Sequence, residues 1–352
     1  MRLQERIQRT LDTLPHRGFW LPPSDSPDFS TNDYLGLNRD GIIRQILQAV
    51  PAEWLRGGSA SRYLGGEAPP FAALEALVRT LWGPQEEALL YPSGLVANLT
   101  FWSVIPQRGD TIVYDKRVHA SIRQGVRLSE ATSWGFPHQN WEEAERLIRR
   151  ASGEIFVAVE SLYSMEGTSP LVEALSYFHT RYGCHIVVDE AHTTFILPQG
   201  ASWSERVGLR PLARLFTFGK AVGLVGAVWV GPWWLIELLR RKGWGGIYTT
   251  ALPPFLAWAV GEVLRRSAEW ESRRQRLWQL IGWTRQYLAA HGYTYQGLEG
   301  PIALLSDAHP LPLKRLYPPT VLQPAYRLSL HAFNTEAEIQ ALFPLAHSTP
   351  SE

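Results

Sequence analysis

The sequence lacks the features that mark several classes of protein. One cysteine, Cys184, in 352 residues excludes an intrachain disulfide framework and a cysteine-rich metal site. The formal net charge is only +1, from 34 basic and 33 acidic residues, so no strong field would attract a nucleic acid. The longest apolar run, 221–236, is interrupted by glycine and proline and is shorter than the ~20 residues of a membrane-spanning helix. We therefore expect a cytoplasmic globular protein with no metal site and no nucleic-acid or membrane partner.

What the sequence contains is an alternation of two kinds of segment. Residues 1–14 predict an amphipathic helix rather than a signal peptide. From residue 69 onward, apolar residues at helical spacing alternate with short apolar runs rich in β-branched residues. The predicted helices are 69–83, 93–105, 141–152 and 171–183, and the predicted strands are 87–92, 110–115, 154–161, 184–192 and 214–219. This alternation indicates parallel βαβ units and an open sheet covered on both faces.

The pattern changes after residue 253. A long helical stretch, 254–292, precedes two short strand-like runs at 300–306 and 325–333. We therefore predict an α/β protein in three parts. These are an N-terminal helix and arm (1–38), a large domain built on a mostly parallel sheet (39–252), and a linker helix with a smaller C-terminal α/β domain (253–352).

Lys220 is the only charged residue between positions 215 and 231, a stretch that is otherwise apolar and rich in glycine. A lysine in such surroundings extends to solvent or is kept from water for a chemical purpose. Burial lowers the pKa of a lysine and favours the neutral amine, which attacks carbonyl groups.

Other polar residues follow the predicted strands, at the edge of a parallel sheet where ligands bind. Together they match the needs of pyridoxal 5′-phosphate (PLP). Lys220 can form an imine with its aldehyde, and Asp189 can keep its pyridine nitrogen protonated. Backbone N–H groups at Ser93 and Gly94, where a strand turns into a helix, can hold its phosphate. His119 can stack on the ring, and Ser164 and Thr217 can donate hydrogen bonds. Taken singly, each of these residues also has an ordinary structural interpretation, such as a helix cap or a solvated charge.

The order of ten short motifs resembles that of the α-oxoamine synthases, a branch of the fold-type-I (aspartate aminotransferase-like) PLP enzymes. Within that family the sequence is most similar to the members that serve biotin synthesis. The motifs are "NDYLGL" (32–37), "RGGSASRYLGGE" (56–67), "SGLVAN" (93–98), "DKRVHAS" (115–121), "SMEG" (164–167), "DEAH" (189–192), "TFGKA" (217–221), "YTTALPP" (248–254) and, after "YPPTV" (317–321), "YRLSL" (326–330).

The resemblance implies a role for individual residues. Lys220 would bind the cofactor and act as the base at the substrate α-carbon, Asp189 would hold the pyridinium, and His119 would stack on the ring. The other implied cofactor contacts are His192 at the phenolic oxygen, Ser93, Gly94, Leu95, Ser164 and Thr217, with Thr249 or Thr250 reaching the phosphate from the second subunit of a homodimer. Arg327 would pair with the amino-acid carboxylate, and Asn32, Thr320 and Arg17 would contact substrate.

The implied reaction is a decarboxylative condensation of L-alanine with a pimeloyl thioester, carried on coenzyme A or on a carrier protein. One departure from the family lies after "DEAH", where Phe195 and Pro198 replace a glycine-rich segment, so we expect a bulkier pocket wall. The alternatives are a sister enzyme that uses glycine or another acyl donor, such as 2-amino-3-ketobutyrate ligase or 5-aminolevulinate synthase, and a relative without catalytic activity. A nucleotide-binding P-loop is excluded because the sequence around Lys220 lacks its glycine spacing and its hydroxyl residue.

Overall fold

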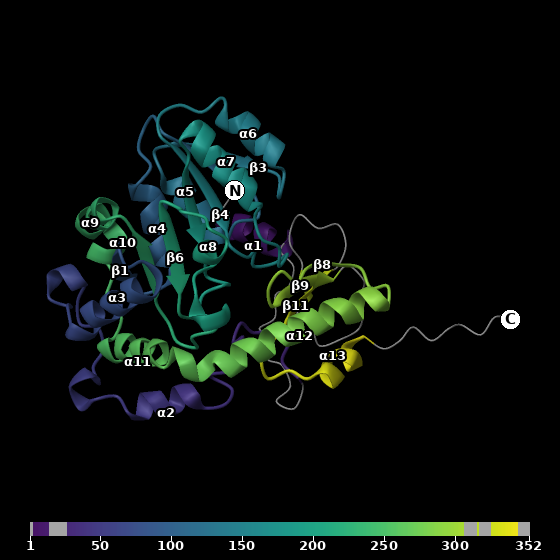
Figure 1. Cartoon of the computed structure of the whole chain (residues 1–352). Coiled ribbons are helices and arrows are strands. Elements are labelled where there is room, and N and C mark those ends of the chain that lie inside the picture. The colour runs from purple at the N-terminus through teal and green to yellow at the C-terminus, as the bar shows by residue number, and fades with distance from the viewer. Residues whose placement is uncertain (1–2, 14–26, 306–314, 317–324, 344–352) are drawn as a thin grey trace.

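Two β-sheets organise the chain (Figure 1). The structure is a computed structural model, and it describes residues 3–13, 27–305, 315–316 and 325–343. The larger sheet has seven strands in the order β1-β7-β6-β5-β4-β2-β3. Its strands are β1 (Glu87–Tyr91), β2 (Thr111–Asp115), β3 (Thr132–Phe136), β4 (Ile155–Glu160), β5 (His185–Asp189), β6 (Ala213–Thr217) and β7 (Ala227–Gly231).

Strand pairing in this sheet is parallel from β3 to β6, whereas β7 runs antiparallel to both of its neighbours, β1 and β6. The predicted fold class, a mostly parallel sheet of the fold-type-I kind, is therefore confirmed. The five predicted strands correspond to β1, β2, β4, β5 and β6. Two strands, β3 and β7, were not predicted, and β7 lies in the glycine-rich stretch after Lys220.

Helices cover both faces of the sheet. Those of the larger sheet region are α3 (Pro69–Trp82), α4 (Gly94–Val104), α5 (Ala120–Leu128), α6 (Trp141–Ile148), α7 (Val172–Tyr182), α8 (Trp203–Arg206), α9 (Trp233–Lys242) and α10 (Trp244–Ile247). Successive strand residues point to opposite faces, so Phe156 and Ala158 pack with α4, α5 and α9, whereas Val157 and Val159 pack with α6 and α7. The inner strands β4 and β5 are thus buried on both sides, which explains their nearly continuous apolar sequence.

The smaller sheet is antiparallel and has the order β10-β11-β9-β8. Its strands are β8 (Tyr295–Gly297), β9 (Ile302–Leu305), β10 (Arg315–Leu316) and β11 (Ala325–Ser329). The helix predicted over 254–292 is two helices, α11 (Pro254–Arg265) and α12 (Glu271–Ala290), separated by a 3-10 turn at Ser267–Trp270. In Figure 1, α12 extends from the larger sheet region to the smaller sheet, beside α13 (Glu336–Leu342). The division at residues 252 and 253 remains our prediction.

The N-terminal part contributes α1 (Leu3–Thr13), α2 (Ile42–Gln48) and two 3-10 turns, Ala52–Trp54 and Arg62–Leu64. The segment before α2 lies against the C-terminal sheet, because Phe29 O accepts from Ser329 N (2.9 Å) and Tyr34 O accepts from Ala332 N (2.8 Å). His331 fastens the same contact, with its Nε2 3.1 Å from Thr31 O. Residues about 300 positions apart are thereby held together.

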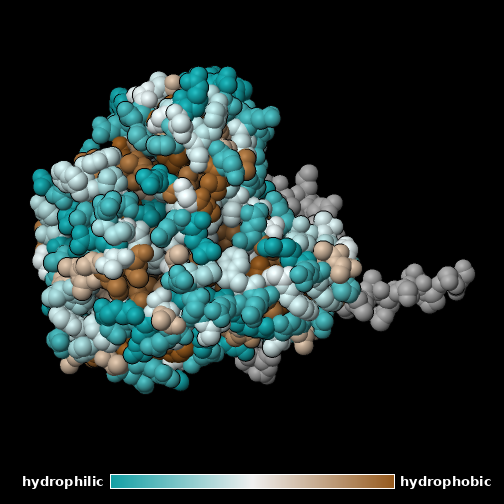
Figure 2. Space-filling view, in the orientation of Figure 1, coloured by the Kyte–Doolittle hydropathy of each residue, from teal (hydrophilic) through white to brown (hydrophobic). Residues whose placement is uncertain are grey.

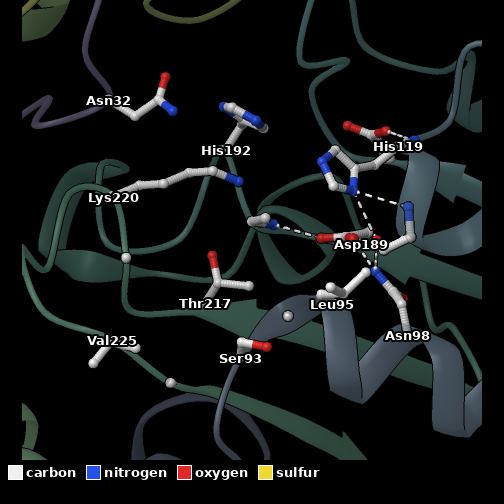
Figure 3. Close-up of a pocket in the computed structure, with 16 residues that line it drawn as sticks. Asn32, Ser93, Leu95, Asn98, His119, Asp189, His192, Thr217, Lys220 and Val225 are labelled. Atoms are coloured by element: carbon white, nitrogen blue, oxygen red, sulfur yellow. Dashed lines mark hydrogen bonds between the residues drawn. The ribbon is translucent and has the colours of Figure 1, made fainter. Parts of the chain in front are cut away.

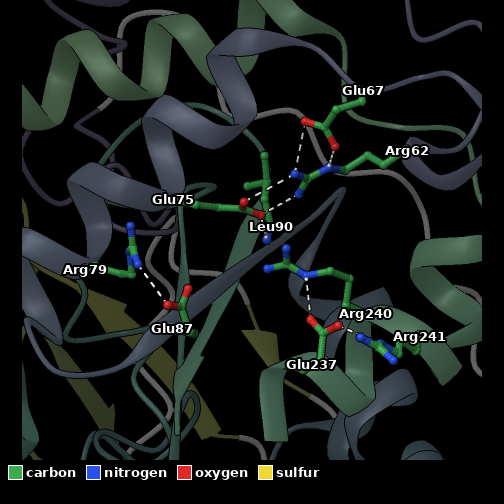
Figure 4. Close-up of polar contacts among 9 residues, drawn as sticks. All are labelled: Arg62, Glu67, Glu75, Arg79, Glu87, Leu90, Glu237, Arg240 and Arg241. Atoms are coloured by element: carbon green, nitrogen blue, oxygen red, sulfur yellow. Dashed lines mark hydrogen bonds and ion pairs between the residues drawn. The ribbon is translucent and has the colours of Figure 1, made fainter. Parts of the chain in front are cut away.

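Ion pairs anchor the glycine- and serine-rich stretch 56–67 to the larger sheet (Figure 4). Arg62 pairs with Glu67 (Nε–Oε2 2.7 Å) and with Glu75 on α3, and Glu75 Oε1 also accepts from Leu90 N of β1 (2.8 Å).

Figure 2 shows apolar side chains gathered in a hollow over α4, α5 and α8 within a mostly hydrophilic surface. None of the helices in the described ranges is long and apolar enough to cross a membrane.

Candidate active site

A cavity of about 270 Å³ opens at the carboxyl ends of the larger sheet's strands (Figure 3). Much of its lining comes from residues at, or just after, the ends of strands, as expected for a parallel sheet. The lining residues that carry polar groups from these ends are Ser93, His119, Glu160, Asp189, Thr217 and Lys220. Asn32 reaches the same cavity from the N-terminal segment, and His192 from the loop after β5.

Asp189, the last residue of β5, is 6 % exposed. Its carboxylate accepts from Asn98 Nδ2 (2.9 Å) and from the backbone N–H of Ala191 (3.0 Å). Asn98 also donates to Ser121 Oγ (2.9 Å), whose oxygen is 2.7 Å from His119 Nδ1. This chain of contacts fixes Asp189 and His119 relative to each other, with the carboxylate able to hold a cationic ring nitrogen.

Lys220 is half-buried and lines the cavity from the loop between β6 and β7. Burial lowers the pKa of Lys220 from its ordinary value of 10.5 to about 8, although the carboxylates of Asp189 and Glu160 favour the ammonium form. The loop is held by a hydrogen bond from Gly223 N to Lys220 O (2.8 Å), and Gly223 has a φ of 77°, a conformation that glycine adopts without strain. A substantial neutral fraction at physiological pH suits the amine for attack on a carbonyl.

The N-terminus of α4 forms the opposite wall. Ser93 caps the helix by accepting from Val96 N (3.3 Å), and the free N–H groups of its first turn favour an anion. A side chain at Gly94 would contact Thr217, since a Cβ there would lie 2.8 Å from Thr217 Cγ2. Glycine thus lets the helix end approach β6 closely.

His119 caps α5 and is held from two sides. Its Nδ1 accepts from Ser121 N (3.2 Å), and its backbone N–H donates to the carboxylate of Glu160. Burial lowers the pKa of His119, so the ring is neutral at physiological pH. The pKa of Glu160 is raised well above its ordinary value, mainly by burial and secondly by the nearby charge of Asp189. A neutral, fixed imidazole is suited to stacking on an aromatic ligand.

Asn32 and His192 line one side of the cavity, and Arg327 and Tyr34 contact them from behind. Arg327 is 8 % exposed and donates to Asn32 Oδ1 (3.0 Å), Ser329 Oγ (2.6 Å) and the backbone carbonyl of Ser164 (2.6 Å). Tyr34 OH is 2.7 Å from His192 Nδ1. Burial, with the positive charges of Lys220 and Arg327, lowers the pKa of His192 well below its ordinary value. The pair Arg327–Asn32 presents a fixed guanidinium, the group suited to a carboxylate.

The aminotransferase class I and II family matches residues 25–334. The chain belongs to that family. Among its relatives, 8-amino-7-oxononanoate synthase of Chromobacterium violaceum is 35 % identical over 337 residues, which cover 90 % of this chain and 87 % of that protein. The enzyme of the same name from Acidithiobacillus ferrooxidans (strain ATCC 53993) is 33 % identical, covering 96 % and 92 % of the two chains.

Solved structures share the fold of this aminotransferase-family chain. Serine palmitoyltransferase from S. paucimobilis, with a bound PLP–myriocin aldimine, matches with a TM-score of 0.84 at 22 % identity, covering 97 % of this chain and 94 % of that one. The 8-amino-7-oxononanoate synthase of Francisella tularensis matches with a TM-score of 0.77 at 25 % identity, covering 91 % and 96 %. The protein is a PLP-dependent enzyme of the α-oxoamine synthase type.

The residues present fit this cofactor. Two polar atoms of the cavity, Asn98 Oδ1 and Thr217 Oγ1, are buried without a hydrogen-bond partner in the described part of the chain. The donor set combines a lysine amine, a carboxylate, a flat imidazole and a helix N-terminus, which are the groups that an aldehyde, a pyridinium, an aromatic ring and a phosphate require. No cluster of histidine, cysteine, aspartate and glutamate that could hold a metal ion occurs among the residues described.

The cavity brings together most of the predicted site residues. These are Asn32, Ser93, Gly94, Leu95, His119, Asp189, His192, Thr217 and Lys220. Arg327 touches Asn32 at its edge, whereas Ser164 contributes a backbone carbonyl to Arg327 and does not line the cavity. Thr249 lies in a separate small hollow beside Arg62, and Thr250 is exposed. The predicted substrate residues Arg17 and Thr320 lie outside the described residues.

The expectation of a bulkier pocket wall is wrong for Phe195, which is buried but does not line the cavity. Its ring packs beneath the guanidinium of Arg274, 4.4 Å away, and its carbonyl accepts from Arg274 Nε (2.9 Å). Phe195 has a φ of 68°, which is unusual for a residue with a side chain. The aromatic side chain therefore turns into the core, and Ala191 and His192 form the wall instead.

Sequence reasoning missed Asn98, Ser121 and Glu160. All three line the cavity and were within motifs already singled out, "SGLVAN", "DKRVHAS" and the end of the strand at 154–161. Asn98 and Ser121 are polar residues inside otherwise apolar helical faces, a pattern that indicates a buried polar network. Tyr34, in "NDYLGL", was also missed.

Proposed function

We propose that the protein is an 8-amino-7-oxononanoate synthase. It would condense L-alanine with a pimeloyl thioester, releasing CO₂ and the free thiol, and so serve biotin synthesis. The observation that supports this best is the similarity, over nearly the whole length of both chains, to enzymes of that name. The serine palmitoyltransferases share the fold at only 22 % and 24 % identity, and this likeness in fold does not make serine the favoured substrate of the present protein.

The geometry agrees with the chemistry that this reaction needs. When bound, PLP supplies an electron-withdrawing ring that stabilises negative charge at the α-carbon of an attached amino acid. Asp189 would hold the ring nitrogen in its protonated form, and His119 would stack on the ring. Lys220 would accept the α-proton at Nζ, because a pKa of about 8 lets the amine exchange protons near neutral pH.

Arg327 would orient the amino-acid carboxylate. Its Nε and both Nη atoms are already engaged by Ser164 O, Ser329 Oγ and Asn32 Oδ1, so the guanidinium is fixed before substrate arrives and little ordering is left to be done on binding. Asn32 lines the cavity beside it and would contact the same carboxylate.

The proposed reaction is tested by measuring product and CO₂ from the cofactor-loaded enzyme. Alanine, glycine and serine should each be paired with pimeloyl-CoA, pimeloyl-carrier protein and acetyl-CoA. We expect product from alanine with a pimeloyl thioester and none with the variant Lys220→Ala. Product from glycine alone would identify a sister α-oxoamine synthase, and the absence of turnover with all pairs would identify a relative without catalytic activity.

We also propose that two copies form a homodimer. Three large apolar side chains are exposed near one another: Tyr63 (71 %) and Leu64 (69 %) on the 3-10 turn Arg62–Leu64, and Tyr248 (82 %) after α10, which contacts that turn. A second copy on this surface would remove them from water and bring Thr249 or Thr250 toward its cavity. We expect Tyr248→Glu to shift the sedimentation coefficient to that of a monomer and to weaken PLP binding. Leu128→Glu, at an exposed leucine at the end of α5, should change neither.

A further inference from the structure

Tyr34 lies between two residues that face the active site. Its hydroxyl oxygen is 2.7 Å from Nδ1 of His192 and 3.5 Å from Nη2 of Arg327. The three side chains are buried, and Tyr34 has no exposed surface at all. The hydroxyl therefore makes no hydrogen bond to solvent, and its single proton must be donated to a neighbouring group of the protein.

The hydrogen-bonding capacities of these groups set the direction of the contacts. Arg327 can only donate, so the weak contact at 3.5 Å makes Tyr34 an acceptor toward it. Asn32 Oδ1, which accepts from Arg327 at 3.0 Å, lies 3.2 Å from the Tyr34 hydroxyl and is the other acceptor within reach of its proton. The much shorter distance to His192 indicates that Tyr34 donates its proton to Nδ1.

Both partners are in the protonation state that this direction needs. Burial raises the pKa of Tyr34 to about 12, so the hydroxyl keeps its proton. His192 is neutral, because burial and the cations Lys220 and Arg327 oppose a second proton on its ring. A neutral imidazole has one N–H, and if Nδ1 accepts, the proton is on Nε2. Within the described residues no hydrogen bond engages Nε2, and it is not enclosed by protein.

We propose that Tyr34 is a positioning residue that holds His192 in the tautomer whose Nε2–H points into the cavity. Arg327, Tyr34 and His192 then form a relay in which each group donates to the next, ending in a donor for an anionic oxygen of the bound cofactor. Such relays fix the tautomer of a histidine that touches a ligand. The inference rests on the cavity being the PLP site of the proposed function.

The tautomer can be measured directly in the full-length protein. Histidine labelled with ¹⁵N on the ring gives long-range ¹H–¹⁵N correlations that identify the protonated nitrogen, and His192→Asn assigns the signals of that ring. We expect His192 to be neutral with its proton on Nε2, both without PLP and with PLP bound, and only Nε2 to shift strongly on loading. A proton on Nδ1, or on both nitrogens, would overturn the proposal.

Tyr34→Phe removes the donor while keeping the ring. We expect the ¹⁵N chemical shift of His192 Nδ1 to move to the value of an unprotonated ring nitrogen that accepts no hydrogen bond. We also expect kcat/KM to fall by up to about tenfold, the usual effect of one lost hydrogen bond. Tyr91→Phe is the matched control, because Tyr91 is equally buried and its hydroxyl has no partner among the described residues. It should leave His192 unchanged.

Unchanged His192 signals in Tyr34→Phe would also refute the relay. If that variant does not fold, the wild-type tautomer alone decides the question. Because the tautomer is read without turnover, a failure of this inference is distinguishable from a failure of the proposed function, which is decided by the amino acid and the thioester that give product.

Discussion

The pKa of Lys220 leads to a prediction about how fast the cofactor-free enzyme captures PLP at different pH values. The neutral amine is the reactive form. A pKa of about 8 instead of 10.5 means that roughly one lysine in eleven is neutral at pH 7, compared with roughly one in three thousand. The site therefore raises the reactive population about 300-fold. We expect the capture rate to increase about tenfold per pH unit below pH 8 and to level off above it.

The assay follows the visible absorption that appears when the enzyme binds PLP, from pH 6 to pH 10. Rates with a simple lysine derivative at each pH correct for the titration of PLP itself, and Lys220→Arg should give no band. In Asp189→Asn the levelling-off should move below pH 8, since the carboxylate that favours the ammonium form has been removed. A rate that still rises tenfold per unit at pH 9.5 would show that the cavity does not perturb Lys220, and the reasoning would be wrong.

The same pKa has a consequence for stability, and its sign is fixed. Between pH 8 and 10.5 the unfolded chain binds a proton at Lys220 that the folded chain does not, so this group makes the free energy of unfolding rise with pH across that window. The change is at most about 3 kcal/mol. It should disappear in Lys220→Met, and the difference between the two proteins in urea unfolding at pH 8 and pH 10 measures it.

Three further predictions concern residues around the site. Gly94→Ala places a Cβ 2.8 Å from Thr217 Cγ2, so we expect PLP affinity, measured by cofactor titration, to fall about tenfold or more. Adding Thr217→Ser, which removes Cγ2, should restore most of that affinity, and no recovery would contradict the steric explanation. Arg327→Lys keeps the charge but loses the fork of donors, so KM for alanine should rise tenfold or more while kcat changes less; equal effects on both constants would contradict a binding role. Phe195→Gly relieves about 1 kcal/mol of backbone strain but loses a buried ring beneath Arg274 that contributes about 3 kcal/mol or more to stability. Thermal unfolding of the variant should therefore occur at a lower temperature, and a more stable variant would show that strain dominates.

The sequence allowed much of the cofactor side of the site to be predicted. The strands that end at Asp189 and Thr217 are apolar runs buried on both faces, and such runs are recognisable without a structure. Lys220 is conspicuous because the residues around it carry no charge. These features depend on local sequence, so they could be placed before any contact was known.

What could not be predicted depends on contacts between distant segments. Asn98 meets Asp189 across 91 positions, and its polarity in the sequence does not reveal that partner. Phe195 was expected in the pocket wall because glycines usually occupy that segment, yet Arg274, on α12, draws its ring into the core. The antiparallel β7 was missed because its glycine-rich stretch resembles a loop.

The hydrogen bonds between the segment Phe29–Tyr34 and residues of β11 and beyond have a consequence for the order in which the two sides of the cavity form during synthesis on the ribosome. Strand β5 with Asp189, and the loop after β6 with Lys220, emerge well before Arg327 is synthesised. The amino-acid side of the cavity, by contrast, is assembled from Asn32 and Arg327, which are 295 positions apart. A nascent chain can therefore complete its cofactor half first, and it becomes competent to select a substrate only after β11 has been synthesised.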